Sequence, residues 1–477
     1  MGSVFNPWKR YFLNDAFYKP GGPVFLITSG EGAATGIAAS RNITWMTYAE
    51  RLGALFLILE HRFYGESQPT GWTWYKYSTC FQNIHFYFIV KLMLSSIFST
   101  LIIATNSMYL SFNYRDLSTA SLHYLSSRQA LADIVNFRTE IARKLGLTEN
   151  KWVTFGGSYG GSLAVWSRIK HPNLFAAAVS SSAPIQAKLN FYEFNEVIGR
   201  ILSAHNSECP KAVKEAFAIL VQMLKRRKYY SKVKKDFRLC EPIKIHSPRE
   251  TAFLMENMIH LVQSFVHKQV NKVIKGEPEE INIDTLCDNM TDASLGSPYD
   301  RLTKIVHLFL KSKHKRCIST NYSEEVEELS NSSLDYLRMK YDRQWFYQCC
   351  TEFGFFKTTE SKNQPFSGTP LRFFFHTCSD VFGPKFGRDL AVWGVRNTNK
   401  YYGGFNVIGS KIIFSNGSND PWHRLGIIKD ISKDLPAVFI KGEGHCADAL
   451  EQDDTDSAEL IEVREKIFQI LQKWLKQ

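Results

Sequence analysis

The sequence predicts an open, mostly parallel α/β sheet that presents a nucleophilic serine at the end of one strand. Six short runs are apolar throughout instead of alternating with polar residues, which is typical of parallel strands covered on both faces. Apolar residues at helical spacing follow the second run and recur at the C-terminus, so strands and helices alternate as in an α/β sheet. The six runs are residues 23–28, 54–59, 151–155, 175–181, 411–414 and 437–440.

The third run leads into Gly156-Gly157-Ser158-Tyr159-Gly160, which fits the G-x-S-x-G turn that presents a nucleophile. A helix-compatible run of small and apolar residues follows, so the motif has the strand–turn–helix setting that it requires. Glycine tolerates the backbone angles of a sharp turn and lets the helix approach the strand closely. We therefore predict Ser158 as the nucleophile, with a plain turn serine as the alternative.

A serine hydroxyl needs a base within hydrogen-bond reach and a carboxylate that orients the base. In hydrolases with this turn, the chain order is Ser, then Asp or Glu, then His. Asp420 follows the run 411–414 and His445 follows the run 437–440. Because all three residues come directly after predicted strands, we predict Ser158, Asp420 and His445 as a catalytic triad.

Two alternatives to this triad remain open in the sequence. Asp420 precedes Pro421 and could simply begin a turn, and His445 could be a surface loop residue. His423 and His376 compete for the role of base, although neither directly follows a predicted strand.

The oxyanion of a tetrahedral intermediate requires backbone donors near the nucleophile. The N–H of Tyr159, the residue after the serine, is one expected donor. The second is expected from the loop after the first predicted strand, at Gly30 or Glu31.

Composition excludes several other classes of function. The net charge of +12 is spread over 477 residues, and the densest basic cluster, residues 225–235, reads as the solvated face of a helix, so no nucleic-acid partner is expected. No zinc-ligand spacing, Walker loop or dinucleotide fingerprint occurs, so we expect neither metal nor cofactor. Nine scattered cysteines and several glycosylation sequons favour disulfides in an oxidising compartment. The chain opens without a signal peptide, and we interpret this as a missing N-terminus.

Residues 71–114 do not resemble their neighbours. They include a largely apolar run, residues 86–104, that is just long enough to span a bilayer but contains Lys91. A membrane span here would separate two parts of one sheet, so we do not expect a membrane anchor. The composition resembles translated AT-rich non-coding sequence, and our hypothesis is a retained intron or an error in the gene model.

At these residues the chain resembles the serine peptidase family that includes lysosomal Pro-X carboxypeptidase, dipeptidyl peptidase II and thymus-specific serine protease. Residues 344–348 and the Gly-His-Cys at 444–446 look closest to the thymus-specific branch. The resemblance runs from about residue 5 to the C-terminus and is interrupted by 71–114. The matching pieces are residues 30–32, 60–67, 155–161, 181–184, 350–355, 416–422 and 444–446.

The resemblance implies an α/β-hydrolase fold with an inserted, mainly helical cap domain. It gives a first hydrolase part at residues 1–190, the cap at 191–400 and a second hydrolase part at 401–477. It also implies peptide substrates, cleavage near a chain end with a preference for proline, a lysosomal, endosomal or secreted location, and a homodimer.

Two details are specific to this chain. Trp422 could belong to an apolar proline pocket, or it could be an ordinary core tryptophan. Cys349 stands where relatives usually have threonine, and Cys80 lies in the atypical segment, so seven family-like cysteines remain and one is free or pairs atypically. The pairing is left open.

Two other functions compete with an active serine exopeptidase. An esterase or lipase uses the same nucleophile turn, and peptide against ester turnover separates them. A non-catalytic or misfolded product would result if residues 71–114 disrupt the site, because an exposed apolar run of this size invites aggregation.

Overall fold

The computed structural model describes residues 2–6, 9–35, 43–69, 116–244, 247–270, 278, 280–333 and 341–477. The atypical segment 71–114, with its apolar run and Cys80, lies outside the described residues. No helix in the described part is long and apolar enough to cross a membrane.

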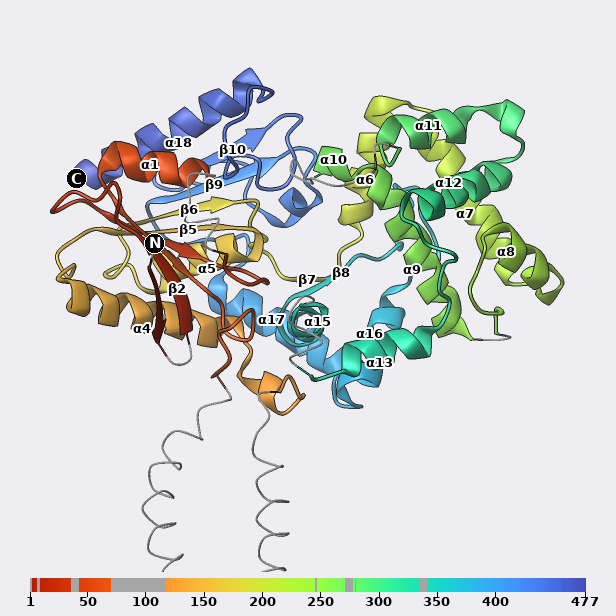
Figure 1. Ribbon diagram of the computed structural model, residues 1–477, viewed down its shortest axis with the longest axis horizontal. Coiled ribbons are helices and arrows are strands. Elements are labelled where there is room, and N and C mark those ends of the chain that lie inside the picture. Colours follow the sequence, from red (N-terminus) through yellow and green to blue (C-terminus); the bar gives the residue numbers. More distant parts are fainter. Residues whose placement is uncertain are drawn as a thin grey trace, which may run out of the picture.

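An eight-stranded sheet forms the centre of the larger half of the molecule (Figure 1), with the strand order β1-β2-β4-β3-β5-β6-β9-β10. All pairs from β4 to β10 are parallel, whereas β1 and β2 add to one edge in antiparallel register. The six predicted strands are all present and lie next to one another, which confirms an α/β-hydrolase fold. The strands are β1 Gly2–Asn6, β2 Lys9–Asn14, β3 Val24–Thr28, β4 Leu55–Leu59, β5 Trp152–Gly157, β6 Ala177–Ser181, β9 Ile412–Gly417 and β10 Ala437–Ile440.

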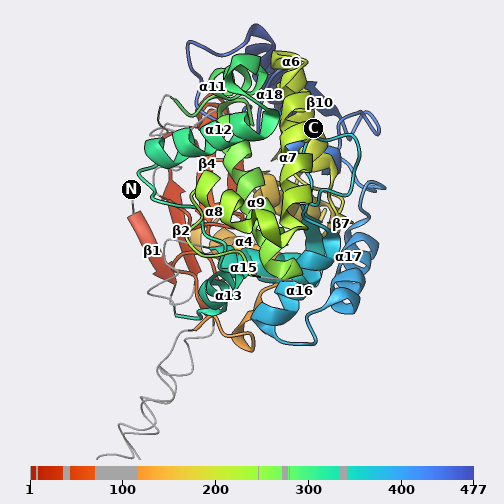
Figure 2. The ribbon, with the colours of Figure 1, turned by 90° about the vertical axis from the view of Figure 1, so that its right-hand side faces the viewer.

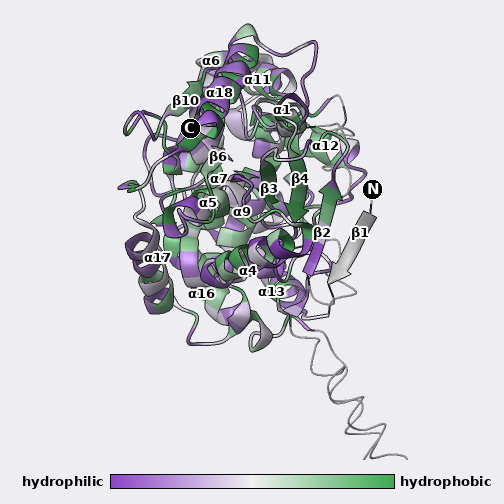
Figure 3. Ribbon diagram, turned by 90° about the vertical axis from the view of Figure 1, so that its left-hand side faces the viewer, coloured by the Kyte–Doolittle hydropathy of each residue, from purple (hydrophilic) through white to green (hydrophobic). Residues whose placement is uncertain are grey.

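The sheet lies between two layers of helices, as its uniformly apolar strands require. One face packs against α1 (Thr44–Leu52) and α18 (Ala458–Lys476), and the other against α4 (Ser127–Leu145) and α5 (Ser158–Lys170). Figure 3 shows β3 and β4 as hydrophobic, while the helix α17 (Arg388–Tyr402) carries many hydrophilic residues.

The chain between β6 and β9 is mainly helical. We call the helices α6 to α13 the helical cap, and Figure 2 looks onto it. A short parallel ladder, β7 (Lys188–Asn190) with β8 (Gly354–Phe356), joins its two ends between the cap and the sheet (Figure 1). The cap helices are α6 Glu193–His205, α7 Cys209–Leu224, α8 Tyr230–Asp236, α9 Pro248–Phe265, α10 His267–Val270, α11 Ile283–Thr291, α12 Pro298–Ser312 and α13 Tyr322–Ser330.

The return from the cap to the sheet is also helical. α15 (Asp342–Gln348) continues into a π-helical turn, Cys349–Phe353, before β8. α16 (Leu371–Phe382) and α17 follow, and Tyr402 of α17 stacks on Trp166 of α5 with ring centroids 3.8 Å apart. This contact places the end of α17 against the helix layer that α4 and α5 form on one face of the sheet.

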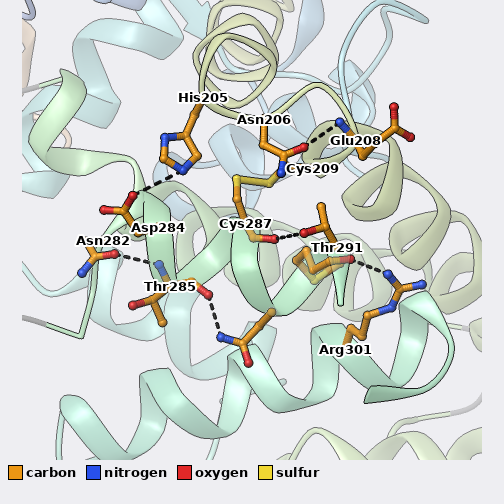
Figure 4. The surroundings of a disulfide bond; sticks show 12 residues. His205, Asn206, Glu208, Cys209, Asn282, Asp284, Thr285, Cys287, Thr291 and Arg301 are labelled. Carbon is orange, nitrogen blue, oxygen red and sulfur yellow. Dashed lines mark hydrogen bonds and ion pairs between the residues drawn. A yellow bond between two sulfur atoms is a disulfide. The ribbon is translucent and has the colours of Figure 1, made fainter. Parts of the chain in front are cut away.

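In the described part of the chain, three disulfides cross-link the helices. Cys209–Cys287 ties α7 to α11, and Cys240–Cys317 ties the segments that follow α8 and α12. Cys350–Cys378 joins the π-helical turn to α16. Polar contacts surround the first bond, including an ion pair between His205 and Asp284 at 3.4 Å (Figure 4).

Two cysteines in the described part, Cys349 and Cys446, are free. Of the seven family-like cysteines, six are therefore paired and Cys446 is the unpaired one. The atypical Cys349 is buried, and it forms no disulfide with any described residue.

Candidate active site

Ser158 stands at the sharp turn between β5 and α5. Its φ is +54°, a left-handed conformation that a non-glycine residue adopts only where the surroundings enforce it. The turn is packed backbone against backbone: a Cβ on Gly156 would lie 2.2 Å from the carbonyl oxygen of Gly160, and one on Gly160 would lie 2.4 Å from that of Thr28. These two glycines are therefore required by close approach, and they hold the serine at the carboxyl end of the sheet.

Asp420 and His445 lie side by side in the loops after β9 and β10. Asp420 Oδ2 is 2.9 Å from His445 Nδ1. The other carboxylate oxygen accepts the backbone N–H of Trp422 at 2.9 Å, which fixes the carboxylate at the start of a short 3₁₀ turn, Pro421–Leu425. The Asp420 side chain is fully buried, and that of His445 is 18% exposed. The fixed carboxylate therefore sets the orientation and the tautomer of the imidazole.

Two opposing effects act on the pKa of His445. Burial acts to lower it, but the carboxylate of Asp420 and the neighbouring Cys446 sulfur outweigh burial and raise the pKa well above its ordinary value of 6.5. A protonated imidazole at this position is therefore stabilised.

The two competing histidines are placed elsewhere. His423 is buried, and its Nδ1 donates to the backbone carbonyl of Asp420 at 2.6 Å. His376 lies exposed on α16. Neither ring contacts the Asp420 carboxylate, so His445 is the histidine that the structure brings to it.

Glu31 approaches the nucleophile with its side chain. Burial raises the pKa of this carboxyl, while the nearby His445 and a hydrogen bond from the Ser158 hydroxyl act in the opposite direction. Among the residues that the structure describes, no hydrogen bond joins Ser158 to His445. A serine hydroxyl turns by rotation about one bond, and catalytic hydrogen bonds often tighten only when substrate is present.

The expected oxyanion donors lie in one neighbourhood. A Cβ on Gly30 would lie 2.9 Å from the backbone nitrogen of Gly160 and 3.7 Å from the carbonyl carbon of Tyr159. The loop 29–32 thus packs on the first turn of α5, beside the N–H of Tyr159. Helix N-termini favour negative charge, which suits an oxyanion at this point.

A buried polar network behind the turn was not predicted from the sequence. The Tyr159 hydroxyl is 3.0 Å from His61 Nε2 and 3.1 Å from Gln348 Nε2, and the hydroxyl of Tyr64 donates to Gln348 Oε1 at 2.6 Å. Burial lowers the pKa of His61 to about 3, so this ring is neutral and serves as a hydrogen-bonding group. The network links the turn at Ser158 to α15. In the sequence, the polar run 60–67 was the only indication of these hydrogen bonds, and their partners are distant along the chain.

An aromatic wall stands beside the histidine. The half-buried Trp422 lies 5.4 Å from Phe191, 6.1 Å from Phe194 and 5.3 Å from Phe355, between ring centroids. Its indole is 6.5 Å from the imidazole of His445. Trp422 therefore belongs to a packed aromatic cluster and also borders the site.

Within the described ranges, no group of three or more His, Cys, Asp or Glu side chains could hold a metal ion. The chemistry that the arrangement supports is nucleophilic attack by a serine hydroxyl with a histidine base.

Comparison with known proteins gives one consistent result. The sequence profile of the serine carboxypeptidase S28 family matches residues 4–86 and 110–467. The unmatched residues between the two stretches fall inside the atypical segment 71–114.

Curated relatives match along nearly the whole chain. Thymus-specific serine protease of Mus musculus is 33% identical over 98% of this chain and 84% of the relative, and the protein of that name in Homo sapiens is 33% identical over 98% and 83%. Lysosomal Pro-X carboxypeptidase of Homo sapiens is 24% identical over 98% and 84%.

Proposed function

The chain belongs to the serine carboxypeptidase S28 family of serine peptidases, and from this premise we propose that it is an exopeptidase with Ser158, His445 and Asp420 as its catalytic triad. The observation that carries this proposal is the 2.9 Å contact between His445 Nδ1 and the fully buried Asp420 carboxylate, next to the strained Ser158 turn.

In this mechanism, His445 Nε2 accepts the proton of the Ser158 hydroxyl as its oxygen attacks the substrate carbonyl carbon. The resulting oxyanion is held by the N–H of Tyr159 and by an amide of the Gly30–Glu31 loop. His445 then gives the proton to the leaving amine and an acyl-enzyme remains, which a water molecule hydrolyses with His445 again acting as base. Asp420 accepts the hydrogen bond from Nδ1–H of His445 throughout.

Restricted access supports cleavage near a chain end. The backbone N–H of His445 donates to the carbonyl of Val270, so the cap touches the catalytic loop directly. The imidazole is only 18% exposed. The half-buried indole of Trp422 offers an apolar surface that suits a proline ring next to the cleaved bond.

An oxidising compartment is part of the proposal. Three disulfides are typical of secreted and vesicular proteins and rare in the cytosol. One of the relatives is named as lysosomal, and we propose a lysosomal, endosomal or secreted location for this chain.

Peptide profiling tests the proposed activity. The full chain is incubated with a mixture of synthetic peptides that carry proline at each position from both ends, and the products are identified by mass spectrometry. We expect cleavage within a few residues of one terminus and next to proline, lost in His445→Ala and retained in the exposed control His376→Ala. Cleavage at internal sites without regard to chain ends would contradict the exopeptidase assignment, and equal activity of His445→Ala would contradict the triad.

A further inference from the structure

Lys357 holds an ammonium group at the aromatic wall beside the catalytic histidine. It follows β8 directly, in the part of the chain that lies between the cap and the sheet (Figure 1). Its Nζ lies 4.1 Å from the ring centroid of Phe194 on α6 and 5.7 Å from that of Trp422. The side chain is half-buried, and its ammonium lies against these two aromatic rings.

This ammonium lacks a counter-ion in the described part of the chain. No carboxylate oxygen there lies within 4 Å of Lys357 Nζ, whereas Lys188, on the neighbouring strand β7, is paired with Glu193. Burial lowers the pKa of Lys357, and the more distant Cys349 and Glu256 only partly oppose this. An ammonium that is partly desolvated without an anion gains more from a bound carboxylate than a solvated surface lysine does.

The neighbouring acids do not take the place of that anion. Burial raises the pKa of Glu256 to about 8, so this carboxyl is mostly protonated at pH 7. The other carboxyl of the site, Glu31, interacts with Ser158 instead.

The distance to the catalytic base fits a short stretch of peptide. Nζ of Lys357 is 5.7 Å from the Trp422 ring, which is 6.5 Å from the imidazole of His445, so the two groups are at most about 12 Å apart. An extended peptide covers about 3.3 to 3.6 Å per residue, so one to three residues bridge this distance. His445 must protonate the leaving amine. The leaving part of the substrate therefore lies on the side of the site where His445, Trp422 and Lys357 stand.

We propose that Lys357 binds a carboxylate of the leaving part of the substrate, within three residues of the cleaved bond. This inference rests on the proposed peptidase function and extends it to the choice between the two ends of a chain. The carboxylate is either the C-terminal group of the peptide, which makes the enzyme a carboxypeptidase, or an acidic side chain near the cleaved bond.

Matched peptide pairs test the proposal and separate the two sources. The first pair is acetyl-Ala-Pro-Phe with a free carboxylate and with a carboxamide. The second pair is acetyl-Ala-Pro-Glu-amide and acetyl-Ala-Pro-Gln-amide. For each we would measure kcat/KM, and also the concentration that protects Ser158 from a fluorophosphonate probe, which reports binding even without turnover. The enzymes are wild type, Lys357→Gln, Lys357→Arg and the exposed control Lys385→Gln.

In wild type we expect one charged peptide to be preferred over its neutral partner by about 10- to 100-fold, as for a charge-assisted hydrogen bond. Lys357→Gln should reduce this ratio to about twofold or less, Lys357→Arg should keep most of it, and Lys385→Gln should leave it unchanged. A preference in the first pair assigns the C-terminal carboxylate, and one in the second pair assigns the side chain.

The proposal would be overturned if wild type showed the same kcat/KM and the same protecting concentration for the charged and the neutral peptide of each pair. It would also be overturned if Lys357→Gln kept the wild-type preference. Each variant is first labelled with the probe alone, so a misfolded variant is recognised by loss of labelling. If wild type itself is not labelled at Ser158, the proposed peptidase function fails rather than the role of Lys357.

Discussion

The sheet and the helical cap are stabilised in different ways, and the difference separates what positions the catalytic groups from what surrounds them. In the described part of the sheet region, the proposed nucleophile, acid and base directly follow the parallel strands β5, β9 and β10, which are held by backbone pairing and, at the nucleophile turn, by glycines in direct backbone contact. No disulfide of the described residues lies within that sheet, whereas two of the three cross-link the cap. The catalytic geometry therefore depends on precise backbone approach, and the cap depends more on covalent cross-links.

The largest effect is expected at the acid of the triad. Asp420→Asn should lower kcat/KM by about 10⁴-fold, because the amide no longer accepts the Nδ1 proton and the imidazole takes the wrong tautomer. In wild type, activity should rise as pH increases through the raised pKa of His445, since the base must be neutral to act. Removal of the carboxylate should move this inflection to lower pH. An unchanged profile of kcat/KM against pH in the variant would contradict the pairing of Asp420 with His445.

Gly160→Ala should come next, because its Cβ would meet the carbonyl oxygen of Thr28 at 2.4 Å and neither backbone can withdraw easily. We expect loss of soluble protein, or a free energy of unfolding reduced by about 3 kcal/mol or more, measured by chemical denaturation. Gly409→Ala is the matched control, since its Cβ meets only side-chain carbons at 3.5 and 3.6 Å. Similar stability of both variants would show that the turn has room that the structure does not indicate.

Loss of the Cys209–Cys287 bond should affect the cap more than the sheet. The bond closes a loop of 78 residues, and removal of such a disulfide costs about 2 to 5 kcal/mol. In a Cys209→Ser/Cys287→Ser variant, we expect faster amide hydrogen exchange in α7 and α11 than in β3 and β5. Uniformly faster exchange over both regions would mean that cap and sheet unfold as one cooperative unit.

The smallest effect is expected at the surface of the sheet region. Arg51 of α1 makes two contacts with Glu465 of α18, at 2.6 and 3.0 Å, with side chains 39% and 44% exposed. A double-mutant cycle with alanine at both positions should give a coupling energy below about 1 kcal/mol, which high salt reduces further. A larger coupling would place this pair among the main contacts that hold the helix layer together.

The sequence was sufficient to predict the six parallel strands and the positions of Ser158, Asp420 and His445 directly after three of them, because both depend on local patterns. β3 and β5 are apolar throughout, and Asp420 and His445 follow strands directly. The two antiparallel strands β1 and β2 were missed. The first residue of β2 is Lys9, which no local pattern marks as buried. That lysine pairs at 3.0 Å with Asp133, a residue of α4 far along the chain.

The direction of single side chains in the site was equally beyond a sequence argument. Glu31 was predicted as a backbone donor, yet its carboxyl also reaches Ser158. Lys357 was not singled out, because its position at the wall depends on Phe194 from the cap and Trp422 from the second hydrolase part. Such a site exists only once three distant segments have folded together.

Covalent labelling of Ser158 tests the central claim most directly. The full chain would be expressed behind a secretory leader and treated with a fluorophosphonate probe, with Ser158→Ala and the buried non-catalytic control Ser167→Ala alongside. We predict labelling of wild type and of Ser167→Ala, none of Ser158→Ala, and a modified peptide that contains residue 158. Labelling that persists in Ser158→Ala, or a folded wild-type protein that the probe does not label, would contradict the assignment of this serine as the nucleophile.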